Sequence, residues 1–173
     1  MKKSIKNSLK KQESKLVKYA NKQGFKVVDG PESMVDWKPG YPANKPAKIA
    51  IQEGLSDLHR IYDLLHELGH HELRKNWQEF EAQYPATASA EYHWILSGIG
   101  KHRRRVAYMA ERIREECDAW NIGLDIAHRK GLNISVTDYR MYSSKWLAQY
   151  TRLYGGRLAR RTRNSENILS ENQ

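Results

Sequence analysis

A long amphipathic helix in the second half of the chain is the pattern that most restricts its fold. From Arg104 to about Arg129, apolar side chains recur every three or four residues, the spacing that places them on one face of an α-helix. Such a helix must bury its apolar face against other elements, so the pattern predicts a packed helical domain. The stripe consists of Val106, Met109, Ala110, Ile113, Cys117, Trp120, Leu124 and Ala127.

Shorter helices and two strands are predicted before and after this helix. One helix runs from Asp57 to about Leu73 and is capped by Ser56. Two strands, Phe25–Val28 and Ala47–Gln52, predict a small sheet near the N-terminus. We therefore expect an α+β fold that is mostly helical. The other expected helices are Ser4–Asn21, ended by Gly24; Trp77–Tyr84, broken by Pro85; Ala86–Leu96; and Ser135–Tyr154, ended by Gly155 and Gly156.

Size and composition indicate one globular domain. The chain has 173 residues, of which 39% are hydrophobic, enough for a single core. No stretch reaches the ~18 uncharged apolar residues that a membrane span needs, and the lysine-rich start has no apolar segment of a signal peptide. The sequence predicts a cytoplasmic protein in which the single cysteine, Cys117, is buried. We expect one domain over residues 1–164 and a disordered tail over residues 165–173.

Charge is distributed unevenly along the chain. Residues 1–26 carry nine lysines against one acid, residues 51–100 have a net charge of −5, and residues 101–173 have a net charge of +7. Basic flanks of this kind can hold nucleic acid or another polyanion by counterion release, although such runs are more often plain solvated surface. The N-terminal helix has only a thin apolar stripe, formed by Ile5, Leu9, Leu16 and Ala20.

The predicted helix over Asp57–Leu73 contains the sequence His66-Glu67-Leu68-Gly69-His70, an HExxH motif. Histidines four residues apart lie one above the other on a helix, so both imidazoles can bind one metal ion. Zinc suits two imidazoles, a carboxylate and an open position. We expect His66 and His70 to be zinc ligands, and Glu67 to be the catalytic base that accepts a proton from the attacking water.

A catalytic zinc needs a third protein ligand. The extended motif HExxHxxGxxH is absent, because Leu73 and Asn76 stand at its Gly and third His. On the long helix, 100° per residue places Glu116 at the border of the apolar stripe, and Glu115 and Asp118 toward solvent. Glu116 is therefore the expected third ligand.

Other residues remain as alternatives for parts of the site. A lone histidine is more often a surface residue or a satisfied core residue than a ligand. A tyrosine can donate a hydrogen bond to a developing oxyanion, but the spacing selects none. The candidates are His71, His93, His102 and His128 as third ligand or transition-state donor, and Tyr92, Tyr139 and Tyr142 as donor.

The strand, the motif helix and the later helix carrying Glu116 and Ala119 resemble the gluzincin metallopeptidases, in particular the small cytosolic ImmA/IrrE-type family of phages and mobile elements. The likeness covers about residues 25–130 and implies a zincin-like domain with an HExxH active-site helix. In that family the ligand Glu is followed by Ala at +3 and by Asn or Asp at +4, which supports the metal site; here position +4 is Trp120. The residues that can replace this support are Asp118 and Asn121.

Two functions follow as hypotheses. The first is a zinc-dependent metallopeptidase that hydrolyses a peptide bond in a protein or peptide partner, with a regulatory role suggested by its small size. The alternative is a non-catalytic regulator on a metallopeptidase-like scaffold, which binds nucleic acid or protein through its basic flanks. The intact Glu67 favours the enzyme, because a structural zinc site has no use for a base. No membrane partner is expected.

Overall fold

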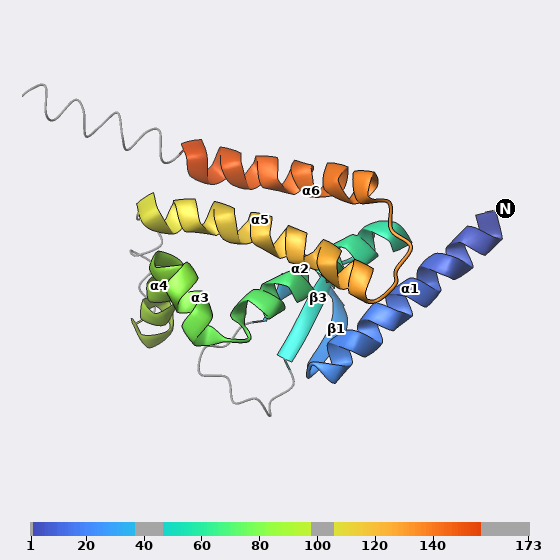
Figure 1. Ribbon diagram of the computed structural model, residues 1–173, viewed down its shortest axis with the longest axis horizontal. Coiled ribbons are helices and arrows are strands. Elements are labelled where there is room, and N and C mark those ends of the chain that lie inside the picture. The colour runs from blue at the N-terminus through green and yellow to red at the C-terminus, as the bar shows by residue number, and fades with distance from the viewer. Residues whose placement is uncertain (1, 37–46, 98–105, 157–173) are drawn as a thin grey trace, which may run out of the picture. The chain divides into compact units, whose positions relative to one another are not determined.

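The protein is mostly helical and has one small sheet (Figure 1). This combination of helices and a sheet confirms the expected α+β class. The computed structural model describes residues 2–36, 47–97 and 106–156. The elements in chain order are α1 (Lys2–Lys22), β1 (Phe25–Gly30), β2 (Met34–Val35), β3 (Ala47–Gln52), α2 (Asp57–Arg74), α3 (Trp77–Gln83), α4 (Pro85–Ser97), α5 (Val106–Arg129), α6 (Val136–Tyr150) and a π-helical turn, η2 (Thr151–Gly155).

Two local expectations are wrong, and one is refined. Strand β2 lies where a loop is expected, because two residues are too few to show an alternating pattern. Gly155 does not end the last helix but belongs to η2. Pro85 separates α3 from α4 as expected and is itself the first residue of α4, where its missing amide hydrogen has no intrahelical acceptor to lose.

The sheet has the strand order β1-β3-β2. Strand β1 is parallel to β3, with Phe25–Gly30 opposite Ala47–Gln52, and β2 is antiparallel to β3 on its other edge. In β3 the side chains of Ile49 and Ile51 are buried and Lys48 is exposed, which is the alternation that the sequence predicts. Strand β3 contacts α2, so the sheet supports the helix that carries the HExxH motif.

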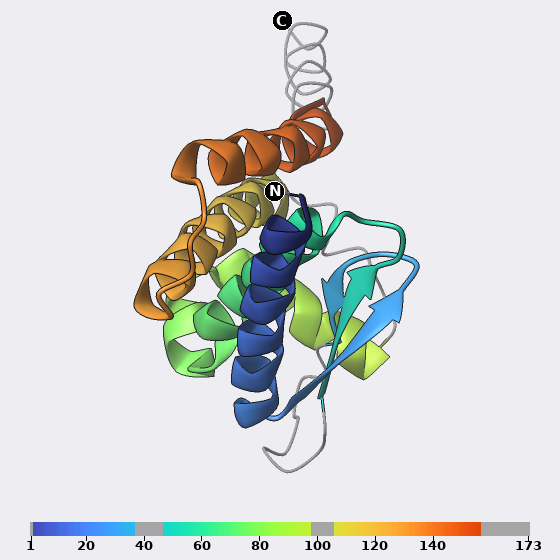
Figure 2. The same cartoon turned by 90° about the vertical axis from the view of Figure 1, so that its right-hand side faces the viewer.

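Helix α1 packs by one edge against β1 and α2 (Figure 2). Leu16 and Ala20 are fully buried, whereas Ile5 is 56% exposed, so only the later half of the predicted stripe is used. Glu13 binds Arg60 of α2 through a 2.9 Å ion pair. Packing and an ion pair therefore both attach α1 to α2.

Helix α2 starts at a side-chain cap and is buried on all sides in its middle. The Ser56 hydroxyl accepts a hydrogen bond from the backbone N–H of His59 at 3.3 Å, as predicted. Every residue from Ile61 to His70 is buried. A helix buried all round has no solvent face for polar side chains, so these side chains need partners inside the protein. The polar residues concerned are Asp63, His66, Glu67 and His70.

Helix α2 approaches the second half of α5 backbone to backbone. A Cβ on Gly69 would lie 2.0 Å from the backbone oxygen of Ala119, and a Cβ on Gly123 would lie 2.7 Å from the backbone oxygen of Leu65. Backbone atoms cannot move aside as a flexible side chain can, so no side chain fits at either position. The helix contact therefore depends on both glycines.

Two compact units can be distinguished. The first contains α1, the sheet, α2 and the second half of α5, and the second contains α3, α4, the first half of α5 and most of α6. In the second unit, Arg114 lies over the Tyr84 ring at 4.5 Å, and Glu111 accepts a hydrogen bond from the backbone N–H of Thr87 at 2.8 Å. Both α5 side chains thus hold the junction of α3 and α4.

No helix in the described part of the chain is long and apolar enough to cross a membrane. Several sequence predictions lie outside the described residues. These are the parts of the basic flank at residues 101–105 and 157–173, the domain boundary at residue 164, and the tail over residues 165–173.

Gly69→Ala is expected to destabilise the protein, because the added methyl group overlaps the Ala119 carbonyl. The free energy of unfolding should fall by about 3 kcal/mol, the upper part of the range for overpacked sites. Urea denaturation of the full chain measures this. Gly156→Ala is the control, because Gly156 has helical backbone angles and an added Cβ there meets nothing within 4 Å. Equal losses in the two variants would contradict the close helix contact.

Candidate metal centre

The HExxH motif lies in the middle of α2. His66 and His70 are one helical turn apart, with ring centroids separated by 4.6 Å. Both are 8% exposed, and Glu67 is 5% exposed. Because residues four apart share a helix face, the two imidazoles lie side by side, and Glu67 is turned by about 100° from His66. Two imidazoles and a carboxylate are thus withdrawn from bulk water on one helix.

Glu116 of α5 completes a group of three potential metal ligands. One potential ligand atom from each of His66, His70 and Glu116 lies within 4.8 Å of the others, and all three residues are buried. No other group of three or more His, Cys, Asp or Glu side chains meets these conditions within residues 2–36, 47–97 and 106–156. These are the three residues that the sequence analysis names as ligands.

The continuity of α5 explains how Glu116 reaches the motif. Ala119 is in backbone contact with Gly69, and the Trp120 ring stacks on His66. Glu116 lies one turn before Trp120 on the same uninterrupted helix and therefore on the same side of it. The contact that joins the two helices also brings the carboxylate to the imidazoles.

The donor set of this group fits a divalent metal ion such as zinc. Zinc binds imidazole nitrogen and carboxylate oxygen at about 2.0–2.2 Å, so tetrahedral ligand atoms lie about 3.4 Å apart. The three potential ligand atoms lie within 4.8 Å of one another, so the side chains must move closer together to bind the ion. Three protein ligands leave one coordination position for water, as in catalytic zinc sites.

Trp120 supports the site from α5. Its ring is stacked on His66, with centroids 4.1 Å apart and an angle of 16° between the planes. The carbonyl oxygen of Trp120 accepts a hydrogen bond from the Tyr139 hydroxyl at 3.1 Å, and the Tyr139 ring packs edge-on against Tyr62 of α2. Aromatic packing by Trp120 therefore orients the His66 ring. Trp120 stands at the position where the resemblance implies an Asn or Asp.

Arg112 holds the Glu116 carboxylate from one turn earlier on α5. Its Nη2 donates to Glu116 Oε1 at 2.6 Å, and its Nη1 donates to Glu115 Oε2. Burial by itself lowers the pKa of Arg112, but the negative charges of Glu115 and Glu116 outweigh burial and raise the pKa well above its usual value. The guanidinium stays charged and fixes one oxygen of Glu116.

The prediction that Glu115 points to solvent is wrong. Its side chain is 0% exposed, and the buried face of α5 includes Ala119 and Gly123 but not Ala110. The apolar stripe is a poor guide here because the closest contacts of α5 use its smallest residues, which let another backbone approach. Glu116 is accordingly inside the buried face and not at its border.

The other candidate histidines are not part of the group. His71 packs edge-on against Phe25 with centroids 4.6 Å apart, and burial lowers the pKa of its imidazole. His93 and His128 are exposed. His102 lies outside the described residues.

The candidate oxyanion donors have different surroundings. The Tyr139 hydroxyl already donates to Trp120, and burial raises its pKa. Tyr142 is buried and Tyr92 is 58% exposed. The geometry therefore assigns Tyr139 to the support of Trp120.

Three residues near Glu116 on α5 differ in their exposure. Asn121 is exposed, so it does not replace the family's support residue, and Asp118 is half-buried. Cys117 is half-buried and not fully buried as expected.

Arg112 and Asp63 are not among the residues predicted from the sequence. Asp63 is 4% exposed and accepts a hydrogen bond from the Ser33 hydroxyl at 2.5 Å, while Ser33 Oγ accepts one from the Gln52 backbone N–H at 3.0 Å. This chain of bonds ties α2 to the sheet. The spacing of Arg112 and Glu116, four residues apart on a helix, is a signal that could have revealed that pair.

A comparison of the chain with family models, curated proteins and solved structures gives no match. The site therefore has to be interpreted from its own geometry.

The purified chain is expected to bind about one zinc ion, because three protein ligands are buried together. His66→Ala and His70→Ala should abolish tight binding, and Glu116→Gln should weaken it by at least tenfold. Elemental analysis and competition with a chromophoric chelator measure these effects. His128→Ala removes an exposed imidazole from the end of α5 and should bind zinc like the wild type. Loss of zinc in that variant alone would place the site elsewhere.

Proposed function

We propose that this chain is a zinc-dependent metallopeptidase of the gluzincin type, which hydrolyses a peptide bond in a protein partner. The observation that carries the proposal is the buried group of His66, His70 and Glu116, with Glu67 between the two histidines on α2. The donor set suits zinc. Its lone cysteine is compatible with a cytoplasmic location.

Each residue of the site has a distinct role in this proposal. His66, His70 and Glu116 hold the metal, which when bound supplies a Lewis acid that polarises the scissile carbonyl and acidifies water. Glu67 accepts the proton of the attacking water at its carboxylate and then donates it to the leaving amide nitrogen. Trp120 and Arg112 keep one imidazole and the Glu116 carboxylate in place.

The buried position of Glu67 favours an enzyme over a structural metal site. A structural zinc site is closed by four protein ligands, whereas the group found in the described residues has three. A buried carboxylate beside the ligands, such as Glu67, has no function in a structural site but can have a chemical task in an enzyme. Proton transfer to and from substrate is such a task.

Glu67→Gln is expected to retain zinc and lose peptidase activity. The amide keeps the size of the side chain but cannot accept the proton, so the rate should fall by a factor of about 10² to 10⁴. A fluorogenic peptide library measures hydrolysis, and elemental analysis measures zinc. Glu72→Gln, on the same helix but outside the ligand group, is the control. Loss of zinc in Glu67→Gln to the extent seen in His66→Ala would contradict the catalytic role.

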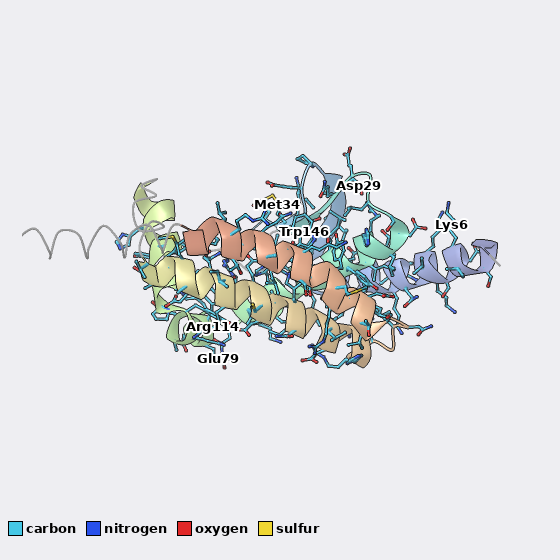
Figure 3. All side chains as sticks on the ribbon, turned by 90° about the horizontal axis from the view of Figure 1, so that it is seen from above. Lys6, Asp29, Met34, Glu79, Arg114 and Trp146 are labelled. Atoms are coloured by element: carbon cyan, nitrogen blue, oxygen red, sulfur yellow. The ribbon has the colours of Figure 1, made fainter. Side chains whose placement is uncertain are left out.

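A second candidate function, polyanion binding, is favoured by the surface of α1. The six lysines of this helix whose side chains the structure describes are all exposed, and its one acid, Glu13, is paired with Arg60. Lys6, labelled in Figure 3, is one of them. At 100° per residue, Lys11, Lys18 and Lys22 lie opposite the buried edge of α1. That edge is occupied by the protein itself, which disfavours insertion into a lipid surface and favours the phosphates of nucleic acid.

Neutralising this face is expected to weaken DNA binding and its salt dependence. For a random-sequence duplex, the slope of log K against log salt should decrease in magnitude by about 2.7 in K11Q/K18Q/K22Q, because each lost phosphate contact removes ~0.9. Fluorescence anisotropy at several salt concentrations measures this. K26Q/K48Q/K145Q changes the net charge equally at exposed lysines outside α1 and should keep the wild-type slope. Equal slopes in both variants would exclude a specific role of α1.

A further inference from the structure

We propose that Glu115 is a positioning residue of the metal centre, and that it acts through Arg112 to keep the Glu116 carboxylate available to the metal. This inference rests on the proposed role of Glu116 as a metal ligand. It does not depend on which reaction the centre performs.

The geometry joins the three side chains into one buried ionic network. Arg112 uses two separate nitrogens, Nη1 for Glu115 and Nη2 for Glu116. The carboxylate side chains of Glu115 and Glu116 are 0% and 1% exposed, and that of Arg112 is 17% exposed. Water therefore screens these charges little, and the charge on each member affects the other two strongly.

The network gives Glu115 a defined electrostatic task. A divalent ion at the ligand group needs the negative charge of Glu116, but Arg112 already donates to one oxygen of that carboxylate. When Glu115 is ionised, the Arg112 guanidinium is shared between two carboxylates. The negative charge of Glu115 then balances the positive charge of Arg112, so that the charge of Glu116 is not needed for this. Arg112 can then orient Glu116 while leaving it the negative charge that binds the metal.

Removing the charge of Glu115 reverses this balance. The full charge of Arg112 then falls on Glu116, so the guanidinium and the metal compete for the same carboxylate. The guanidinium also becomes an uncompensated cation beside a bound dication. We therefore expect weaker metal binding, although Glu115 does not belong to the ligand group.

A double-mutant cycle on the full-length chain tests the inference, with zinc as the probe. Affinities of the wild type, Glu115→Gln, Arg112→Gln and the double variant are measured by competition with a chromophoric chelator at one pH and salt concentration. Glu115→Gln should bind zinc 10- to 100-fold more weakly, the range for residues that orient a metal ligand. The double variant should bind zinc more tightly than Glu115→Gln, because the competing guanidinium is gone.

Three further measurements separate positioning from folding. The visible spectrum of the cobalt(II) form should be the same in wild type and Glu115→Gln, because the ligands are unchanged. Glu115→Asp keeps the charge and should restore most of the affinity even if Glu115→Gln folds poorly. Glu111→Gln removes a carboxylate from the same helix that caps α4, and it should bind zinc within about twofold of the wild type.

The outcomes are distinct. Wild-type affinity in Glu115→Gln, or a double variant no tighter than Glu115→Gln, overturns the inference, because simple structural damage predicts additive losses. If the cycle behaves as expected and no peptide is cleaved, the metal centre and the role of Glu115 stand and the peptidase proposal fails. If the wild type binds no zinc, both proposals fail.

Discussion

The backbone contact between α2 and α5 is the constraint on which the candidate site depends. Gly69 meets the Ala119 carbonyl and Gly123 meets the Leu65 carbonyl, so the two helices approach more closely than any side chain would allow. Trp120 lies next to this contact and Glu116 one turn before it, which brings them against the two histidines of α2. Glycine in a helix interior costs about 1 kcal/mol relative to alanine, and this packing offsets that cost.

The polar residues of α2 are explained by what surrounds them. A helix buried on all sides would ordinarily be apolar throughout, yet α2 carries two imidazoles and two carboxylates in its buried stretch. Asp63 is held by Ser33, and His66 is stacked on Trp120. A metal ion bound by the histidines and Glu116 would compensate the cost of burying these groups. The buried cluster therefore includes side chains that could hold a metal ion.

The charged residues of the chain divide into a buried group of acids and an exposed group of lysines. Four acids lie in the interior, namely Asp63 and Glu67 in the acidic middle of the chain and Glu115 and Glu116 in its basic second half. They are buried in or near the candidate site and do not offset the basic surface. On α1, by contrast, the described lysine side chains, from Lys6 to Lys22, are exposed, and the one acid of the helix is paired with Arg60. The buried acids and the lysines of α1 are therefore two separate features, one of the interior around the candidate metal centre and the other of the surface.

Local signals in the sequence predicted most of the secondary structure and the residues of the candidate site. Periodicity and capping residues located α2, β3 and α6, because these signals act between residues close in the chain. The HExxH spacing placed His66 and His70 on one helix face for the same reason. Helical geometry also selected Glu116, although from an apolar stripe that did not match the buried face.

Packing between segments that are distant in the chain sets which face of α5 is buried, and with it the surroundings of Glu116. Small residues make the closest contacts of α5, and a pattern of large apolar side chains does not reveal them. The pattern therefore predicts Glu115 in solvent, whereas its side chain is buried and paired with Arg112. The stacking of Trp120 on His66 likewise joins residues 54 positions apart. Such contacts arise from packing between distant segments, which local spacing does not encode.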